Sequence, residues 1–192
     1  MKSLEIKGEI RGKTGKKESK KLREQELVPC VLYGIGEPVH FYTSFSEFRS
    51  LVYTPDVFVV NLNIGGETKQ AIVQDMQWHP VDEKLLHADF LQISENVPIK
   101  IELPVTISGS AKGIKAGGKL KVNVRKLKVK GLVKDLPDTV NVDVSDLDLG
   151  QSLKVGDLAA DKIEFLVSKS NVIATVAVTR AAKTAATGKE SK

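Results

Sequence analysis

Apolar and polar residues alternate along most of this chain, a pattern that predicts a protein built mainly from β-strands. In the first half it predicts four separate strands, at residues 3–11, 29–34, 39–43 and 85–93. The first of them is expected to be a half-buried strand, with Leu4, Ile6 and Ile10 on one face. Two more β-rich runs within residues 56–78 are joined at Gly65 and Gly66, a pair typical of a hairpin turn. Together these segments predict a small barrel or a curled sheet.

Two short helices are predicted between these strands. Residues 17–27 favour about two helical turns, with Leu22 inward and charged residues outward at Lys17, Lys20, Lys21 and Glu24. The three lysines lie close enough to repel one another, so a negatively charged partner would offset that cost. In residues 44–52, Ser44 and Glu47 have capping-box spacing, and the apolar residues follow helical spacing at Phe45, Phe48, Leu51 and Val52.

The second half is predicted to be all-β. Residues 99–109 alternate cleanly, with apolar residues at Ile101, Leu103, Val105 and Ile107, and further strands are predicted within 138–147 and 170–179. In residues 119–131 the apolar positions change phase, because Leu127 and Val129 are out of step with Leu120, Val122 and Val124. One extra residue near Arg125 and Lys126 would restore the apolar face, so we predict a β-bulge there.

The distribution of aromatic residues indicates two separately packed cores. Nine of the ten aromatic residues lie in the first 90 residues, and only Phe165 lies beyond. Polar residues and a proline interrupt the pattern at residues 92–98, as is typical of a boundary between domains. We therefore predict a first domain at residues 1–93, a second at 94–182 and a disordered tail at 183–192.

Positive charge is concentrated in two segments. The chain of 192 residues has a formal net charge of +5, but residues 11–23 alone hold seven basic residues and one acid. Residues 111–134 hold nine basic residues and no acid, and residues 135–170 then hold eight acids against three bases. Basic segments of this kind are typical of proteins that bind a phosphate backbone, although a solvated lysine-rich surface has the same composition.

Other features of the composition narrow the class of protein. Cys30 is the only cysteine, which excludes an internal disulfide and a zinc site built from cysteines. No run approaches the roughly 18 consecutive apolar residues of a membrane span, and the N-terminus has no apolar signal segment. We therefore expect a cytoplasmic protein that contacts no membrane.

The chemistry-bearing residues gather in residues 77–90, which include His79, His87 and Asp89. In a strand, His87 and Asp89 project from the same face. They suit an acid–base pair, a partial metal site, a structural hydrogen-bonding pair or a pair that contacts base edges. No further His or carboxylate pattern completes a metal site, and no nucleophile stands in a known motif. We therefore expect no catalytic residue, metal or cofactor.

Two motifs resemble those of a known family. The segment RGKTGKKESKKLREQELVPCVLYG is similar to the first signature of bacterial ribosomal protein twenty-five of the large subunit, whose long form is the general stress protein Ctc. QDMQWHPVDEKLLHADF resembles the second signature of that family, and residues 109–120 and 136–158 resemble the domain found only in the long form. The resemblance covers roughly residues 5–180.

The resemblance implies a fold and a function. It implies a fold that is mainly β with a few short helices, in which an N-terminal antiparallel β-barrel precedes a C-terminal all-β domain. It further implies a structural, non-enzymatic protein that binds 5S ribosomal RNA in the central protuberance of the large subunit. Partners of the C-terminal domain would be 23S rRNA or neighbouring ribosomal proteins, and the free protein is expected to be a monomer.

Carried over position by position, the resemblance predicts two groups of RNA-binding residues. The basic group would contact phosphates and the groove: Arg11, Lys13, Lys16, Lys17, Ser19, Lys20, Lys21 and Arg23. The polar group would contact sugars and base edges: Tyr33, Gln74, Gln77, His79, His87 and Asp89. His79 stands beside Pro80 and has the alternative role of fixing the end of a strand.

The chain departs from the family pattern at a few positions, and other functions remain open. Glu26 stands where glycine is usual, Cys30 where alanine is frequent, and Lys20 and Lys21 where arginine is common. Lysine is a point charge without the guanidinium fork, so these residues should position the RNA rather than select its sequence. The alternatives are an RNA-processing enzyme that uses His87 and Asp89, and a non-RNA interaction protein that acts through residues 94–180.

Overall fold

The computed structural model describes residues 2–94, 97–158 and 163–179 and divides into two compact units. The first unit comprises Met1–Ile99 with Leu132–Lys134, and the second Lys100–Gly131 with Asp135–Lys192. The division falls after residue 99, whereas the sequence places the boundary after residue 93. The predicted tail at 183–192 lies outside the described residues.

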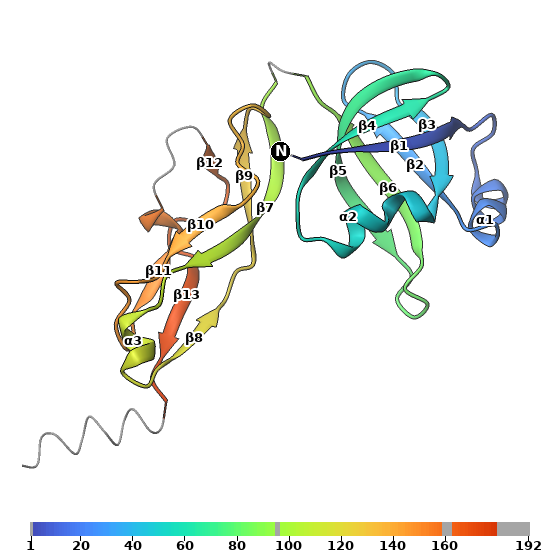
Figure 1. Ribbon diagram of the computed structural model, residues 1–192. Helices are drawn as coiled ribbons and strands as arrows, with labels where there is room; N and C mark the ends of the chain where they lie inside the picture. Colours follow the sequence, from blue (N-terminus) through green and yellow to red (C-terminus); the bar gives the residue numbers. More distant parts are fainter. Residues whose placement is uncertain (1, 95–96, 159–162, 180–192) are drawn as a thin grey trace, which may run out of the picture. The chain divides into compact units, whose positions relative to one another are not determined.

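Six strands of the first unit close into a barrel (Figure 1). They are β1 (Lys2–Ile10), β2 (Leu27–Tyr33), β3 (Val39–Ser44), β4 (Phe58–Ile64), β5 (Glu67–Trp78) and β6 (Leu85–Gln92). Around the barrel their order is β1-β3-β2-β6-β5-β4. The mainly β fold with few helices is confirmed, and four of the six pairings are antiparallel. The pairs β1–β4 and β2–β6 are parallel.

The predicted turn and helices of the first unit are present. Gly65 and Gly66 join β4 to β5, and both have positive φ values (60° and 91°), as a tight hairpin turn requires. Helix α1 (Lys16–Glu24) follows β1, while a 3-10 helix η1 (Phe45–Phe48) and helix α2 (Arg49–Tyr53) follow β3. The predicted capping box is wrong in detail, because Ser44 accepts its hydrogen bond from Ser46 N, at 3.4 Å, rather than from Glu47.

Aromatic rings fill the centre of the barrel. Phe41, Phe48 and Phe90 are fully buried, and the ring centroids of Phe41 and Phe90 lie 5.6 Å apart. Gly8 on β1 faces this cluster, because a Cβ atom there would lie 2.6 Å from the Phe41 ring. The barrel wall therefore has no room for a side chain at position 8.

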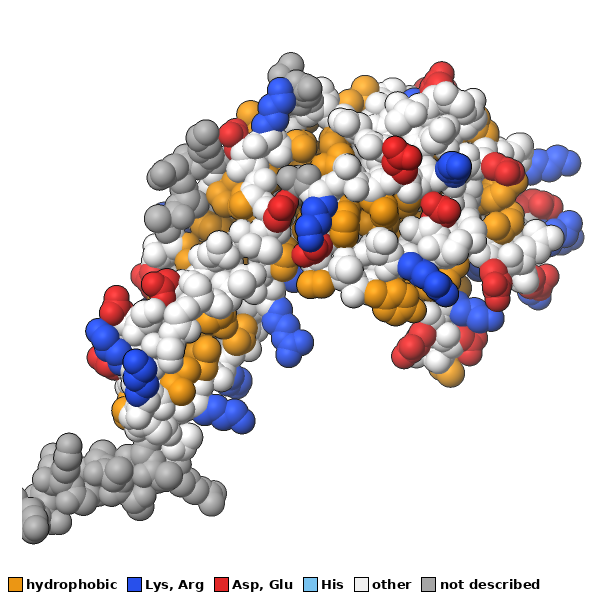
Figure 2. All heavy atoms as spheres, in the orientation of Figure 1, with side chains coloured by type: hydrophobic (Ala, Val, Ile, Leu, Met, Phe, Trp, Pro, Cys, Tyr) orange, Lys and Arg blue, Asp and Glu red, His pale blue; other side chains and the backbone are white. Residues whose placement is uncertain are grey.

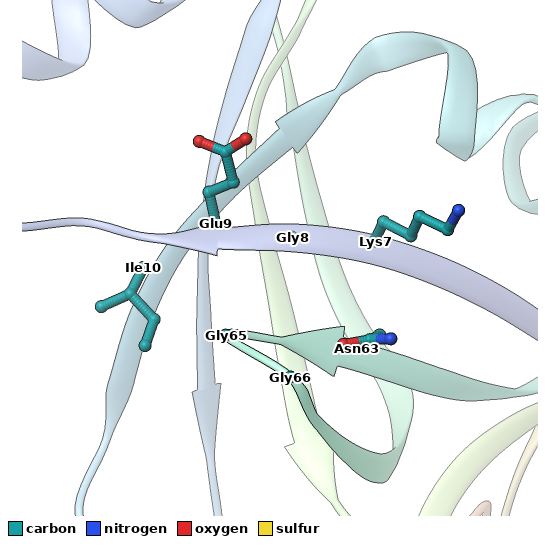
Figure 3. Close-up of a pocket in the computed structure, with 7 residues that line it drawn as sticks. All are labelled: Lys7, Gly8, Glu9, Ile10, Asn63, Gly65 and Gly66. Carbon is teal, nitrogen blue, oxygen red and sulfur yellow. The ribbon is translucent and has the colours of Figure 1, made fainter.

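The prediction that Ile10 shares the buried face of the first strand with Ile6 is wrong. Ile6 is fully buried, but Ile10 is 61% exposed, because β1 leaves β4 after Gly8 and pairs with β3 instead. A shallow pocket lies at this point, lined by the end of β1 and the β4–β5 turn (Figure 3). Ile10 lies against Gly65 there, since its Cδ1 would be 2.9 Å from a Cβ atom on that glycine.

The second unit contains two small sheets (Figure 1). The first has the order β10-β7-β9-β12, formed by Val140–Asp143, Ile99–Ser108, Lys126–Gly131 and Glu164–Phe165. The second has the order β11-β13-β8, formed by Ser152–Lys154, Val172–Ala177 and Lys119–Val122. A short helix α3 (Lys112–Lys115) precedes β8, and a 3-10 helix η2 (Val155–Asp157) follows β11.

The β-bulge predicted near Arg125 and Lys126 is wrong. Strand β8 ends at Val122 and strand β9 begins at Lys126, and the two strands belong to different sheets. Val122 is 39% exposed, whereas Leu127 and Val129 are fully buried. The change of apolar phase is real, but its cause is a crossing from one sheet to the other, each of which buries a different face.

Candidate nucleic-acid interface

Strand β6 carries two of the predicted RNA-binding residues on the outer face of the barrel. Side chains alternate between the two faces of a strand, and Ala88 and Phe90 are buried in the core. His87 and Asp89 therefore point outward. The two side chains project from the same face, as the sequence predicts, and His87 Nδ1 lies 2.7 Å from Asp89 Oδ1.

This His–Asp contact is close, but it is not an aligned hydrogen bond. His87 Nδ1 is buried and has no hydrogen-bond partner in the described part of the chain. The short distance therefore reports an electrostatic contact without the angle that an N–H···O bond requires. The two side chains remain 26% and 28% exposed, so each still has surface with which to contact a partner.

Strand β5 reaches the same outer face because it contains a β-bulge. The register against β6 shifts between Val73 and Asp75, which leaves Gln74 as the extra residue. Val73 packs against the core, and the extra residue moves Asp75 outward, directly opposite Asp89. Gln77 lies opposite His87 on the same pair of strands. The bulge thus brings two residues of β5 beside the His–Asp contact.

Tyr33 of β2 completes this group. Strand β2 runs parallel to β6, with Val31 beside Asp89 and Tyr33 beside Leu91. Burial raises the pKa of Tyr33, and the negative charges of Asp89 and Asp75 raise it further. The phenol therefore stays protonated at neutral pH and can donate a hydrogen bond. We refer to Tyr33, Asp75, His87 and Asp89 as the polar set.

Helix α1 carries the predicted lysines beside β2 (Figure 1). It begins after Gly15, whose φ of 139° suits glycine, and it has no side-chain N-cap. Lys20 Nζ lies 3.9 Å from Glu24 and Lys21 Nζ 3.6 Å from Glu18. The predicted repulsion among the lysines is therefore partly relieved by acids within the helix. Blue and red side chains accordingly lie side by side at the border of the first unit where α1 is drawn (Figure 2).

Two arginines attach α1 to the barrel. Arg11 Nη2 donates a hydrogen bond to Ser19 Oγ at 3.2 Å, and Arg23 Nε donates to the backbone oxygen of Leu86 at 3.0 Å. The first bond joins the end of β1 to the helix, and the second joins the helix to β6. Arg11, Ser19 and Arg23, all predicted as RNA contacts, therefore also hold the basic helix next to the polar set.

His79 has a structural role at the turn between β5 and β6. Its Nδ1 accepts hydrogen bonds from the backbone N–H groups of Val81 (3.4 Å) and Asp82 (3.1 Å). A nitrogen that accepts these bonds carries no proton, so its 3.4 Å approach to the Asp82 carboxylate is not an ion pair. This geometry favours the alternative that His79 fixes the strand end.

His40, for which the sequence predicts no role, also lies on this face. His40 on β3 lies opposite Val31 on β2, and Val31 lies beside Asp89 on β6. The backbone N–H of Arg11 donates to the carbonyl of His40 at 2.9 Å. His40 is exposed and stands between Arg11 and the polar set. The alternation around Phe41 already indicates an outward side chain at this position.

Asp75 is the second residue of this face that the sequence alone does not indicate. It stands between the candidates Gln74 and Gln77, but only the bulge, which the alternation does not reveal, turns it toward Asp89. The remaining candidates are exposed on the loop, the helix and β5: Lys13, Lys16, Lys17, Gln74 and Gln77.

Within residues 2–94, 97–158 and 163–179, no three His, Cys, Asp or Glu side chains are close enough to share a metal ion. No helix there has the length and apolar character of a membrane span.

A closed six-stranded barrel with a basic helix on its outer face, followed by a second all-β unit, defines a two-unit β-protein with a surface suited to a polyanion. Comparison with known proteins identifies the family within this class, because residues 6–90 match the ribosomal L25p family. Residues 98–180 match the C-terminal domain of ribosomal protein TL5. The chain belongs to the ribosomal L25p family, in its long, two-domain form.

Relatives of similar length support this assignment. The large ribosomal subunit protein bL25 of Azobacteroides pseudotrichonymphae is 48% identical over 184 residues, or 95% of this chain and 97% of the relative. The bL25 protein of Phocaeicola vulgatus is 48% identical over 97% of this chain and 98% of its own length. That of Porphyromonas gingivalis is 41% identical over 99% of this chain and all of its own length.

Proposed function

We propose that this protein is a structural, non-enzymatic component of the large ribosomal subunit in the cytoplasm, where it binds 5S rRNA in the central protuberance. Membership of the ribosomal L25p family and the names of the relatives support the ribosomal role. The observation that carries the RNA site is that Tyr33, Asp75, His87 and Asp89 meet on one outer face, next to the basic helix α1.

The basic helix supplies the part of binding that does not depend on sequence. Lys13, Lys16 and Lys17 are exposed and form no ion pair within the described ranges of the chain. Lys20 and Lys21 pair only with exposed glutamates, and such surface pairs contribute little to stability. These lysines are free to exchange their carboxylates for phosphates, which would release counterions from the RNA.

The polar set supplies the selective part of binding. The minor groove of A-form RNA is wide and shallow, and base edges and 2′-hydroxyls are accessible there. In that groove the N2 amino group of guanine is a donor that distinguishes G·C from A·U pairs. Two carboxylates, Asp75 and Asp89, offer acceptors for such amino groups, while the Tyr33 hydroxyl can donate to a 2′-oxygen or a base acceptor.

His40 belongs to the same proposed surface. Adjacent strands lie about 4.8 Å apart, so an RNA that contacts both Arg11 and Asp89 must pass over His40 and Val31. His40 can donate to a phosphate or a 2′-hydroxyl, and Val31 can contact a sugar. The two residues would form the floor between the basic helix and the polar set.

The second unit would contact another component of the large subunit, either 23S rRNA or a neighbouring ribosomal protein. Its basic segment, residues 111–134, favours RNA, while the acids of residues 135–170 suit a basic protein. The protein is expected to be a monomer when it is free of the ribosome.

One substitution tests the selective role directly. Asp89→Ala should lower affinity for a 5S rRNA fragment about 5- to 150-fold, which corresponds to about 1–3 kcal/mol for a base contact. Its affinity for a scrambled duplex should stay the same. Equal losses on both RNAs would show that Asp89 makes no base contact.

The same assay separates the two alternatives. An RNA-processing enzyme would cleave the fragment, and His87→Ala would abolish cleavage while leaving affinity nearly intact. An interaction protein that acts without RNA would lose function on deletion of residues 94–180 but not on substitution of Lys20 and Arg23.

A further inference from the structure

The second basic segment of the chain is divided between two sheets. Residues 111–134 hold nine basic residues and no acid. In the structure, Lys119 and Lys121 stand on β8, whereas Lys126, Lys128 and Lys130 stand on β9 of the other sheet. What reads as one basic run in the sequence is therefore two separate surfaces.

The lysines of these two surfaces differ in their partners. On β9, Lys128 Nζ lies 3.6 Å from Glu102 and Lys130 Nζ lies 3.5 Å from Glu164. On β8, Lys119 and Lys121 are both exposed, and neither forms an ion pair or side-chain hydrogen bond with any described residue. Among the described residues of the unit, therefore, no acid compensates the positive charge on β8, whereas two of the three lysines on β9 are paired with acids.

The strand register extends this surface across β13 to β11. Lys121 lies opposite Thr175, and Thr175 lies opposite Ser152. The hydroxyls of Thr175 and Ser152 are 3.0 Å apart. Lys119 lies opposite Ala177 on the same face. We call these five residues the β8 face. It combines two uncompensated lysines with two hydroxyls and a methyl group.

We propose that the β8 face binds the phosphate backbone of an RNA segment distinct from the one bound by the barrel. Lysine and hydroxyl side chains are typical phosphate contacts and carry no sequence preference. A protein partner is disfavoured, because the centres of protein interfaces are rich in aromatic residues, Met and Arg. The β8 face contains none of these. This inference does not depend on 5S rRNA as the ligand of the barrel.

Edge protection is the main competing explanation for these lysines. Strand β8 is at the edge of its sheet, and lysines on edge strands prevent pairing with a second molecule. That role would require only that Lys119 and Lys121 keep the protein monomeric. It would not require contact with RNA, so the two explanations predict different results.

The test uses the full chain labelled with ¹⁵N and a polyuridylate 20-mer as the probe. We expect backbone amide shifts on β8 and β13 during the titration, in addition to shifts on α1. Lys119→Gln/Lys121→Gln should remove the shifts on β8 and reduce the slope of log affinity against log salt by about 1.4, from two contacts of about 0.7 each on a single strand. The control Lys128→Gln/Lys130→Gln removes the same charge from β9 and should change the slope by less than half as much.

Several outcomes would overturn the inference. Shifts on α1 but none on β8 would contradict it and leave the proposed function of the barrel intact, whereas shifts on β8 alone would support it and count against the barrel. A double variant that self-associates while binding RNA normally would establish edge protection. Equal shifts on β8 with a polyglutamate peptide would indicate an acidic protein as the partner instead.

Discussion

Asp75 on β5 and Asp89 on β6 lie directly opposite each other on the outer face of the barrel, at a register fixed by the bulge at Gln74. Like charges at opposite positions of neighbouring strands destabilise a sheet. Here the two carboxylates lie on the same outer face as Tyr33 and His87, beside helix α1 with its five basic residues. Two acceptors held this close suit a partner that supplies hydrogen-bond donors.

Removing one of these charges should therefore raise the stability of the protein while weakening its binding to RNA. Asp75→Asn relieves the repulsion and should raise the free energy of unfolding by roughly 0.2–1 kcal/mol. It should also weaken binding to 5S rRNA, because an amide replaces part of the acceptor surface. Urea unfolding and RNA titration of the same variant measure both effects. Asp82→Asn, in the exposed β5–β6 turn, is the control and should change neither quantity.

Lys20→Ala should weaken binding to every RNA about equally. Its Nζ lies on the exposed side of α1, 3.9 Å from Glu24, and a phosphate contact carries no sequence information. The slope of log affinity against log salt should fall by about 1 for both cognate and scrambled RNA. Lys69→Ala, on β5 and paired with Glu67, is the matched control. A loss confined to the cognate RNA would assign Lys20 to base recognition.

His40→Ala tests the continuity of the surface between Arg11 and Asp89. The variant should lower affinity for 5S rRNA at least fivefold, as expected for one lost contact of about 1 kcal/mol. Its melting temperature should not change, because the side chain is exposed. The contradicting outcome is that His40→Ala binds 5S rRNA with wild-type affinity while Asp89→Ala, in the same assay, binds more weakly. The RNA would then contact β6 without crossing β3.

Glu26→Gly should stabilise the protein. Glu26 has a φ of 59°, in the left-handed region that costs residues with a Cβ atom roughly 1–2 kcal/mol. The gain is reduced by the greater freedom of glycine in the unfolded chain, so we expect a net increase of about 0.5–1 kcal/mol in the free energy of unfolding. The neighbouring Gln25 has a φ of −95°, and Gln25→Gly should instead destabilise. Glycine is usual at this position in the family that the sequence resembles, and the positive φ of residue 26 explains that preference.

Cys30 should make stability depend on pH in the alkaline range. Its thiol is fully buried, and burial raises its pKa far above the ordinary value, with a smaller contribution from the Asp89 charge. Below a pH of about 8.5 the thiol is neutral in both states, and its contribution is fully present. At higher pH only the unfolded chain ionises, so stability declines by up to about 1.4 kcal/mol per pH unit. Cys30→Ala lowers the overall stability but should remove this part of the decline, and an unchanged decline would contradict the assignment.

Much of the first unit could be predicted from local patterns. The glycine pair at 65–66 predicts its hairpin because the turn needs positive φ, and the contact between His87 and Asp89 follows from their spacing on one strand. The bulge at Gln74 could not be predicted, because Ala71, Ile72 and Val73 form a continuous apolar run before it. Without alternation there is no phase for an extra residue to shift, so the sequence does not indicate that Asp75 faces outward toward Asp89.

In the second unit, a change in the phase of the apolar positions has another cause than a bulge. The phase change between Val122 and Leu127 predicted a bulge, but the chain crosses between sheets there. Periodicity shows which face of a strand is buried, but not the sheet to which the strand belongs, which depends on long-range pairing. The prediction for Ile10 is wrong for a related reason, because the burial of Ile10 depends on where β1 changes its pairing partner from β4 to β3.

The most direct test of the central claim is a salt series with the full chain, binding a 5S rRNA fragment or a scrambled duplex. We expect affinity for both to fall steeply with salt, and a cognate preference of about a thousandfold or more to remain at physiological salt. Equal affinity for the two RNAs at every salt concentration would contradict the account. That result would mean that the surface around Asp89 and α1 binds polyanions in general and does not select 5S rRNA.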